Sequence, residues 1–570
     1  MIKTKRWQID TRITPEADEA LKAFSPVLRQ LLFNRGFASD ETARQFLKAS
    51  TPFDTSPWQL KDMQKVINRL EYAINKKESV VIYGDYDVDG VTATALLVQV
   101  LNNLGANARE YIPNRFDEGY GLNKDALDHL FSENTKLVIT VDCGIRSLEE
   151  AEHARKLNLD LIISDHHHPG NILPAAYAII NPKQPGDSYP DKDLAGVGVA
   201  YKIAEALLER YPQSGIKKDE LLDLVALGTV ADLAPLTGEN RNLVRRGLRQ
   251  LRQTQRQGLF SLAAVASLEL KNINTTNIGF SLGPRLNAAG RLDSALAAFE
   301  LLSTNDIQVA GQLAQKLEIQ NRERQQVTRS MQMQAEKLVL EEGPDSMLLF
   351  AVDPTFNAGV VGLAASRLSE IYYRPAIVAC SGEETTRGSC RSIPEFHITE
   401  ALDSCADILE RYGGHAAAAG FTVKNDHLPE LIRRLKKIAD QQLKGLDLKP
   451  LLNGDVEISL SELDSKLLEQ ISWFEPTGYG NPEPVFVARG VRVISSRTVG
   501  SDAKHLKLNV TDGFSNFDAI GFRLGDLQAD LSKYIDILFT FELNEFNGHK
   551  NLQLNVRDIK SAEKPGEKQI

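Results

Sequence analysis

Three aspartates lie within five residues in the segment Asp85-Tyr86-Asp87-Val88-Asp89-Gly90. Carboxylates held this close repel one another, and bound cations relieve the repulsion. A site for a hard divalent metal ion is therefore the economical interpretation of the segment. A solvated acidic turn is the structural alternative when the motif is taken by itself.

A calcium-binding EF-hand loop begins with the same D-x-D-x-D-G pattern, but it needs a glutamate at its twelfth position and a helix before it. Here the twelfth residue is Leu96, and the preceding residues VVIYG are typical of a strand. The sequence thus favours a catalytic metal site over a calcium loop.

Further candidate ligands end other apolar runs: Asp142 in ITVDCG, Asp165, His166 and His167 in IISDHHH, and Asp232 in LGTVADLAP. Taken singly, such an aspartate is usually a helix cap and a histidine run can be a surface tract. Together with the triple-aspartate segment they supply the mixture of carboxylate and imidazole that suits manganese and similar ions.

The elements that must position these residues are short apolar runs that alternate with amphipathic segments. The runs cover residues 79–87, 136–144, 159–168 and 176–182. This alternation predicts β-α-β units and a parallel sheet. Ligands of such sheets lie beyond the carboxyl ends of the strands, so the polar clusters are expected to share one crevice.

Downstream, residues 312–342 contain neither Gly nor Pro and predict a 31-residue helix, about 46 Å long, that joins two globular units. Five short alternating strands near the C-terminus predict a small barrel, with an OB-fold as the natural candidate. We therefore predict an α/β chain with six parts: an N-terminal helical extension (1–78), a parallel-sheet catalytic domain (79–265), a helical connector with the long helix (266–344), a smaller α/β domain (345–445), a β-barrel (446–562) and a tail (563–570).

The motifs DYDVDG, VDCG, SDHH and GTVADLAP, in this order, resemble the four motifs of the DHH phosphoesterase superfamily. The resemblance implies two divalent cations, Mn²⁺ or Mg²⁺. It places His167 beside the metals or the scissile phosphate and gives Asp85 a supporting role. Tyr83 is a departure, because some members have a metal-binding histidine there. The metal ligands implied by the resemblance are Asp87, Asp89, Asp142, His166 and Asp232, with Asp142 as the bridging candidate.

Over nearly the whole chain the sequence resembles the RecJ family within this superfamily, through segments such as LGPRLNAAGRLDSA (282–295), RGSCRSIPEFHI (387–398) and YGGHAAAAGF (412–421). GSCRS with GGHAAAAG resembles the DHHA1 domain, which faces the DHH active site. The resemblance implies a 5′-to-3′ exonuclease that releases 5′-mononucleotides from single-stranded DNA in recombination and repair. Arginine forks suit a terminal phosphate, and the implied substrate-binding residues are Arg115, Arg285, Arg291, Ser389, Arg391 and His415.

The net charge of −10 counts against a generally basic, DNA-binding surface. One exception is the stretch 241–256, with six arginines and no acid; it is either a solvated helix face or a phosphate-tracking patch.

Four cysteines without a CxxC pair disfavour disulfides and structural zinc. We find no leader and no membrane span, and expect a cytoplasmic monomer, with single-strand binding protein and a helicase as partners implied by the family.

Two other functions share parts of this pattern. A DHH phosphatase for pyrophosphate, phosphoadenosine phosphate or short oligonucleotides would have the same metal motifs, but would not need the barrel and the long helix. A DNA-binding scaffold could keep the fold after losing its metal ligands, whereas all expected acids and both histidines are present here. The exonuclease therefore remains the preferred prediction.

Overall fold

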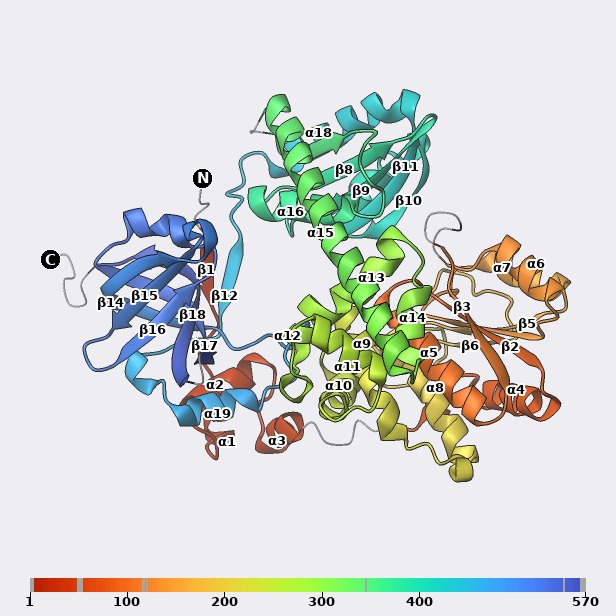
Figure 1. Cartoon of the computed structure of the whole chain (residues 1–570). Helices are drawn as coiled ribbons and strands as arrows, with labels where there is room; N and C mark the ends of the chain where they lie inside the picture. The colour runs from red at the N-terminus through yellow and green to blue at the C-terminus, as the bar shows by residue number, and fades with distance from the viewer. Residues whose placement is uncertain are drawn as a thin grey trace.

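The structure is a computed structural model that describes residues 5–48, 55–114, 118, 121–343, 346–546 and 549–563. Figure 1 shows a parallel-sheet domain, a second α/β domain and a barrel, with one long helix between the first two. These three units are the predicted architecture, which is confirmed. All four cysteines are free, and among the described residues no helix is both long and apolar enough to cross a membrane.

The catalytic sheet has five parallel strands in the order β3-β2-β4-β5-β6. The four predicted strands are β2 (Ser79–Gly84), β4 (Leu137–Val141), β5 (Asp160–Ser164) and β6 (Ala178–Ile180). The prediction missed β3 (Asn107–Tyr111). This strand lies at the sheet edge, where polar and charged residues are common and the apolar pattern that marks central strands is weak.

Helices cover both faces of this sheet, so its central strands are buried almost throughout. Residues such as Val80 and Ile82 pack toward α5 (Val88–Asn103) and α8 (Gly196–Arg210). Their neighbours Val81 and Tyr83 pack toward α6 (Lys124–Ser132) and α7 (Leu148–Lys156). The alternation follows from the two-residue period of a strand, and it leaves only the strand ends open for polar side chains.

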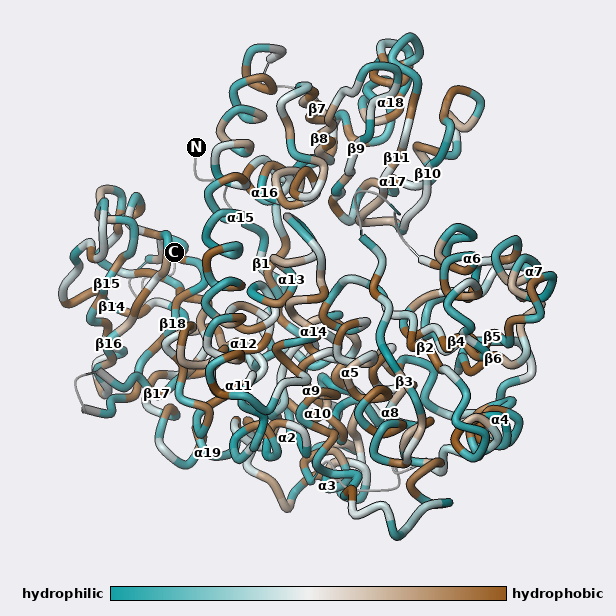
Figure 2. Tube along the Cα trace, turned by 45° about the vertical axis from the view of Figure 1, so that its right-hand side comes forward, coloured by the Kyte–Doolittle hydropathy of each residue, from teal (hydrophilic) through white to brown (hydrophobic). Residues whose placement is uncertain are grey.

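The long helix α15 (Ile307–Glu342) has 36 residues and begins five residues before the predicted start. Asp306 caps it by accepting hydrogen bonds from the amides of Gln308 and Val309, and Gly311 does not interrupt it. Its N-terminal third belongs to the core of the catalytic domain, whereas Ala335 and Val339 belong to the core of the next domain. Hydrophobic and hydrophilic residues alternate along it (Figure 2). The helix thus joins the two cores.

The second α/β domain holds a five-stranded sheet in the order β10-β11-β9-β8-β7. Only β7 and β8 are parallel; the other neighbours run antiparallel. Helix α16 (Val361–Tyr372) packs against β8 and β9. The strands are β7 (Leu349–Val352), β8 (Ala376–Ser381), β9 (Thr385–Arg391), β10 (Leu409–His415) and β11 (Ala418–Lys424).

The C-terminal strands form the predicted barrel, which the pairing of β14 with β17 closes. Closure leaves the barrel without a free sheet edge, and a parallel pairing of β16 with β18 accompanies it. The strands are β14 (Phe486–Val499), β15 (His505–Thr511), β16 (Asn516–Gly521), β17 (Tyr534–Phe546) and β18 (His549–Ser561).

The segment predicted as one N-terminal extension, 1–78, packs in two places. Helices α2 (Pro26–Asn34) and α3 (Asp40–Lys48) share a core with the barrel and with α19 (Ser465–Ser472), as Figure 1 shows. Helix α4 (Met63–Lys76) instead packs into the catalytic domain. Each apolar helix face shows that it will be buried, but not which domain will bury it, so the sequence cannot separate the two parts.

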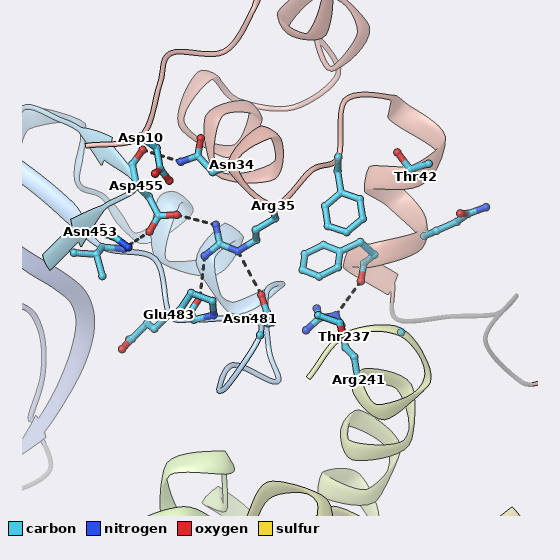
Figure 3. Close-up of a pocket in the computed structure, with 17 residues that line it drawn as sticks. Asp10, Asn34, Arg35, Thr42, Thr237, Arg241, Asn453, Asp455, Asn481 and Glu483 are labelled. Carbon is cyan, nitrogen blue, oxygen red and sulfur yellow. Dashed lines mark hydrogen bonds and ion pairs between the residues drawn. The ribbon is translucent and has the colours of Figure 1, made fainter. Parts of the chain in front are cut away.

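The arginine-rich stretch 241–256 lies mainly on α10 (Gly238–Leu251). It is not simply a solvated helix face or a phosphate-binding patch, the two alternatives that the sequence left open. Arg241, labelled in Figure 3, is buried and donates to a main-chain carbonyl of the N-terminal segment. It also donates to main-chain carbonyls of the loop before the barrel. Arg245 donates to the carbonyl of Leu47, and Arg256 pairs with the buried Asp223. Several of these arginines therefore hold the chain together instead of facing solvent.

A buried ion cluster ties α8 to α10 within the catalytic domain. Lys202 Nζ lies 2.5 Å from Glu239 Oε1 and 2.9 Å from Glu205 Oε2, and Lys202 and Glu239 are 0% and 1% exposed. The Tyr189 hydroxyl also donates to Glu239. Removing the ammonium group would leave Glu239 buried without a cation and would leave Glu205 with Lys218 as its remaining cationic partner.

We expect Lys202→Met to destabilise the catalytic domain by about 3–5 kcal/mol, because breaking a buried pair leaves an uncompensated charge. Thermal and urea unfolding measure the effect. The matched control is Lys218→Met, which removes the half-exposed partner of Glu205 and should cost less than about 1 kcal/mol. Equal losses in the two variants would contradict the role given to the buried cluster.

Candidate metal centre and phosphate pocket

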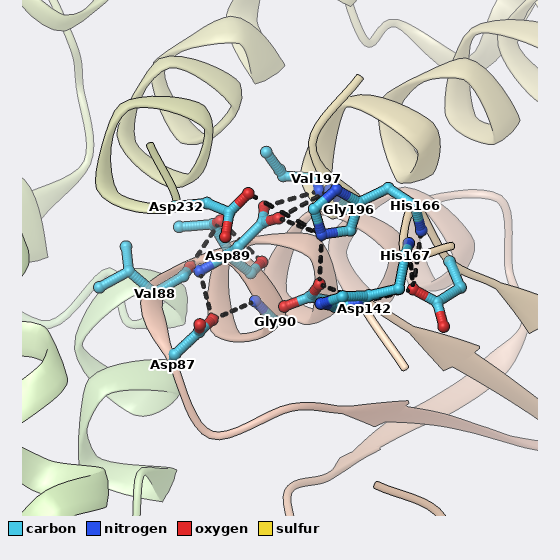
Figure 4. Close-up of polar contacts among 12 residues, drawn as sticks. Asp87, Val88, Asp89, Gly90, Asp142, His166, His167, Gly196, Val197 and Asp232 are labelled. Carbon is cyan, nitrogen blue, oxygen red and sulfur yellow. Dashed lines mark hydrogen bonds and ion pairs between the residues drawn. The ribbon is translucent and has the colours of Figure 1, made fainter. Parts of the chain in front are cut away.

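The predicted acids and histidines meet at the carboxyl ends of the central strands (Figure 4). The triple-aspartate segment follows β2, Asp142 follows β4, and Asp165, His166 and His167 follow β5. Asp232 comes from the other side, at the C-terminal end of helix α9 (Leu222–Ala231) and not after a strand. Asp142 adopts a left-handed backbone conformation with φ 62°, which turns the chain sharply at the end of β4.

His166 lies at the middle of the cluster. Its Nε2 atom is 3.0 Å from Asp142 Oδ1, 3.8 Å from Asp232 Oδ2 and 3.9 Å from Asp89 Oδ2. The potential ligand atoms fall into three overlapping groups whose members lie within 4.8 Å of one another. The groups are Asp89, His166 and Asp232; Asp85, Asp87 and Asp142; and Asp142, His166 and His167. Asp142 and His166 each belong to two of them.

Two helix N-termini fix the carboxylates of the first motif. Asp87 caps α5 and accepts from the amides of Asp89 and Gly90 at 2.9 and 3.2 Å. Asp89 accepts from the amides of Gly196 and Val197, the first residues of α8, at 2.6 and 2.8 Å. The positive end of each helix dipole favours the ionised carboxylate. The sequence analysis missed the role of Gly196 and Val197, for which the run GVGVA before a helical pattern was the available signal.

Asp165 organises the histidines; the sequence analysis named it as a candidate ligand but did not predict this role. Its Oδ1 atom accepts from the amides of His166 and His167 and lies 2.8 Å from His167 Nδ1, while Oδ2 accepts from the amide of Ile145. Burial opposes a charged His167, but the hydrogen bond and charge of Asp165 outweigh it and raise the pKa of His167. Asp165 therefore holds the His167 ring and favours its protonated form.

The cluster is costly to hold together as bare charges. Burial, and then the charge of Asp87, raises the pKa of Asp89 to about 7. Burial, and then Asp89 and Asp87, raises the pKa of Asp232 to about 9. Burial followed by the neighbouring aspartates also raises the pKa of Asp142 well above its ordinary value. In His166, burial and then His167 lower the pKa to about 3, which keeps the ring neutral and able to bind a metal.

Two buried atoms identify what would satisfy the cluster. Asp142 Oδ1 and His166 Nε2 are shielded from water and lie 3.0 Å apart, but within the described residues neither has a partner in hydrogen-bonding geometry. Buried polar atoms are normally satisfied, so these two atoms are natural ligands for a cation. Carboxylate oxygens with one imidazole nitrogen are the donors that Mn²⁺ and Mg²⁺ accept. The residues present thus fit divalent cations.

The side chain of Tyr83 is not aimed at this cluster. Its hydroxyl donates to the carbonyl of Gly121 at 3.0 Å and accepts from Asn123 at 3.2 Å. The ring is fully buried and stacks on Tyr111 with 5.0 Å between centroids. Tyr83 therefore acts as a core residue on the face of β2 that packs toward α6 and α7, and not on the face that packs toward α5 and α8.

Three of the predicted substrate-binding residues line one pocket of about 330 Å³ between α13 (Gly283–Leu292) and the second domain: Arg291, Ser389 and Arg391. Arg387 lines it as well and was missed by the sequence analysis. Residues 387, 389 and 391 alternate along β9 and so share one face of the strand; this two-residue spacing in R-G-S-C-R was the signal that could have revealed Arg387. Gly362 also lines the pocket, and a Cβ atom there would lie 3.0 Å from the Arg391 guanidinium.

Of the other predicted substrate-binding residues, the two that the structure describes do not line the pocket. Arg285 forms an ion pair with Glu318 of α15 at 2.7 Å and donates to the carbonyl of Ser281. His415 is exposed at the end of β10. Arg115 lies outside the described residues. The motif context alone could not show that Arg285 is engaged within the connector.

Helix α13 (Gly283–Leu292) links the metal cluster to the pocket. Its Asn287 side chain accepts from the amide of Val88 at 3.1 Å, and Gly290 lies so close to Tyr86 that an added Cβ would be 2.7 Å from the Tyr86 carbonyl. The next residue, Arg291, donates to the carbonyl of Gly359 in the pocket at 3.2 Å. Because Gly290 and Arg291 are adjacent, their Cα atoms are about 3.8 Å apart, and the pocket adjoins the metal-binding loop.

Family comparisons agree with this division of the chain. The DHH family, N-terminal domain, matches residues 79–229; the DHHA1 domain matches residues 345–445; and the RecJ OB domain matches residues 454–558. Fold and site together define the chain as a metal-dependent phosphoesterase of the DHH class.

Individual relatives narrow the assignment. The chain is 39% identical to the single-stranded-DNA-specific exonuclease RecJ of Bacillus subtilis, over 98% of this chain and 71% of that protein, and 34% identical to its Escherichia coli counterpart, over 97% and 99%. A crystal structure of RecJ with Mn²⁺ from Thermus thermophilus matches with a TM-score of 0.84 at 30% identity, over 98% of this chain and 80% of that one. The chain belongs to the RecJ family.

The metal-free protein should lose stability as the pH rises. A carboxyl whose pKa is raised on folding keeps a proton that the unfolded chain releases, so its stabilising effect is lost between its unfolded value, about 4, and its folded value. For Asp89 and Asp232 this window ends at about 7 and about 9. In chelator, thermal unfolding should therefore occur at a lower temperature at pH 8.5 than at pH 6, and Mn²⁺ should remove most of the difference.

Asp142→Asn removes a carboxyl whose ionisation is opposed by burial and by the neighbouring aspartates, which raise its pKa. At pH 8.5 in chelator it should therefore raise the melting temperature by about 2 °C or more, and it should abolish most of the stabilisation by Mn²⁺. A variant less stable than the wild type in chelator, or stabilised equally by Mn²⁺, would contradict the metal assignment.

Proposed function

We propose that this chain is a metal-dependent exonuclease that degrades single-stranded DNA from the 5′ end and releases 5′-mononucleotides. The observation that carries the proposal is the pairing of a metal-ligand cluster with an arginine-lined pocket, joined by α13. One site would carry out hydrolysis, and the other would hold the strand end at a fixed distance from it. Such a pair favours removal of one nucleotide at a time.

In this proposal Asp89, His166 and Asp232 would hold one divalent cation and Asp87 would hold a second. Asp142, which is grouped with Asp87 and also with His166, would serve both. Asp85 supports the cluster. When bound, the two cations supply a hydroxide nucleophile near neutral pH and neutralise charge on the phosphate. The helix N-termini that hold Asp87 and Asp89 point both carboxylates inward, and the amides of Gly196 and Val197 oppose the rise in the pKa of Asp89 that burial causes.

His167 acts on the phosphate. Its ring is held by Asp165, its side chain is 43% exposed, and its raised pKa favours the imidazolium. A protonated imidazole donates a charge-assisted hydrogen bond to a phosphate oxygen, and this bond strengthens as negative charge develops.

The pocket receives the terminal 5′-phosphate. Arg387 and Arg391 lie on one face of β9 with Ser389 between them, and Arg291 approaches from α13. Burial lowers the pKa of Arg391, and a bound phosphate would offset that cost. Guanidinium groups bind phosphate oxygens through paired hydrogen bonds, which fixes the orientation of the end. The 5′-to-3′ polarity rests on this pocket and on the family.

The barrel provides a groove for the remaining single strand, as OB-folds do. A compact phosphatase for small substrates would have no use for a barrel held to the catalytic domain. For the cell we propose a cytoplasmic monomer that works with single-strand binding protein and a helicase in recombination and repair, which rests on the family alone.

Digestion of single-stranded DNA labelled separately at each end tests the activity. With Mn²⁺ we expect mononucleotides from the 5′ end, and no release with chelator or with Asp142→Ala, which should lower the rate by about 10³-fold or more because one ligand serves both cations. Release from the 3′ end would refute the polarity. Cleavage limited to dinucleotides or pyrophosphate would favour the small-substrate phosphatase, and binding without hydrolysis would favour the scaffold.

Removal of a pocket arginine tests the 5′-phosphate assignment. Arg391→Ala should raise KM for a 5′-phosphorylated oligonucleotide by about 10- to 100-fold, the cost of one charged contact of about 1.5–3 kcal/mol. The same oligonucleotide with a 5′-hydroxyl end should be much less affected. Arg367→Ala serves as the control because this arginine pairs with Glu370 outside the pocket. Equal effects on both ends would mean that the pocket does not read the terminal phosphate.

A further inference from the structure

Arg241 is a buried cation, and no carboxylate among the described residues forms an ion pair with it. Its side chain belongs to α10 of the catalytic domain, and the residue is 3% exposed. Within the described residues its hydrogen bonds all go to main-chain carbonyls: Phe474 at 2.6 Å, Pro476 at 3.0 Å, Trp473 at 3.2 Å and Phe46 at 3.4 Å. Burial lowers its pKa to about 9. A charge is rarely buried in this way unless its position matters.

The accepting carbonyls belong to two other parts of the chain. Phe46 lies in the last turn of α3, and Trp473 and Phe474 lie at the end of α19, just before the barrel. Helix C-termini carry partial negative charge, so they stabilise the guanidinium in place of a carboxylate. The guanidinium also lies 4.1 Å from the centre of the Phe46 ring. A planar fork of donors suits this set of acceptors, and a lysine ammonium does not.

The same junction is tied to the metal centre through a short stretch of chain. Asp232 and Arg241 are nine positions apart, and between them the amide of Leu236 donates to the carbonyl of Tyr479 at 2.7 Å. Thr275, in the connector, donates to the carbonyl of Thr477 at 2.6 Å. Residues 477–479 belong to the loop that leads into β14, the first long strand of the barrel. The barrel is therefore docked on the chain that directly follows a candidate metal ligand.

The loop is stiffened from its other side. The Asn481 side chain donates to the carbonyls of Phe474 and Pro476 at 2.9 and 2.8 Å, the same carbonyls that Arg241 uses. Arg35 reaches Asn481 at 3.4 Å and forms an ion pair with Asp455 at 3.0 Å (Figure 3). A cavity of about 650 Å³ lies beside these residues, so apolar packing fills the junction only in part. Directed polar contacts hold it.

We propose that Arg241 is a positioning residue that holds the barrel in a fixed position relative to the metal centre, so that single-stranded DNA bound to the barrel leads into that centre. This inference rests on the proposed function. Arg241 contacts neither the candidate metal ligands nor the proposed phosphate pocket around Arg391. Its loss should therefore affect only substrates long enough to reach the barrel.

The test compares a 5′-phosphorylated dinucleotide with a 5′-phosphorylated 30-nucleotide strand, both with Mn²⁺. For Arg241→Met we expect KM for the long strand to rise at least about tenfold, which corresponds to about 1.4 kcal/mol, while kcat/KM for the dinucleotide stays within about twofold. Arg241→Lys should fall between the variant and the wild type. Arg246→Met is the matched control, because Arg246 lies on the same helix and pairs with Asp219 of the catalytic domain.

Thr275→Val removes a second docking contact with little change in volume, and it decides the question if Arg241→Met does not fold. It should shift KM for the long strand in the same direction and leave the dinucleotide unchanged. Equal loss on both substrates, or no loss on either, would overturn the proposal. A wild-type protein that digests neither substrate would refute the proposed function and not the docking role.

Discussion

The structure depends on one electrostatic constraint: five carboxylates and two imidazoles must occupy a small, largely buried volume without driving one another apart. Asp89 and Asp142 are almost completely inaccessible to water, and this burial, followed by repulsion from neighbouring aspartates, raises the pKa values of both. The fold resists this repulsion with fixed donors. The N-termini of α5 and α8 direct amides at Asp87 and Asp89. Asp165 is an acceptor: it takes hydrogen bonds from the backbone amides of both histidines and lies 2.8 Å from the His167 ring nitrogen. What these donors leave unsatisfied, Asp142 Oδ1 and His166 Nε2, divalent cations would satisfy.

Glycines make this crowding sterically feasible at two positions. A Cβ on Gly196 would lie 2.7 Å from the Asp142 side chain, and a Cβ on Gly90 would lie 2.5 Å from the Asp85 carbonyl. Both glycines stand at helix starts whose amides serve the cluster. Any larger residue would push the helix N-terminus away from the carboxylates, so the close approach and the electrostatic support depend on each other.

Much of the catalytic domain could be predicted because its signals are local. Fully apolar strands that end in acids predict both the parallel sheet and the edge at which those acids meet, and the C-terminal strands predict the barrel by their alternation. The sequence did not reveal which domain buries the N-terminal helices, nor that Arg285 pairs with Glu318. Both depend on contacts between residues far apart in the chain. An amphipathic pattern or an arginine does not indicate which distant residue it will contact. The roles of Arg387 and Asp165 could have been found, since the spacing along β9 and the first residue of the D-H-H motif were visible.

The central claim is that a metal centre and a terminal-phosphate pocket act at a fixed separation set by α13. A crystal structure of the Asp142→Asn variant would not test this, because that variant alters the centre itself. The direct measurement is diffraction from the wild-type protein with Mn²⁺ and thymidine 5′-monophosphate, using the anomalous signal of manganese. The account predicts manganese peaks among Asp87, Asp89, Asp142, His166 and Asp232, with the phosphate bound at the metals or at Ser389 and Arg391. Manganese bound elsewhere, or a phosphate that contacts neither site, would contradict it.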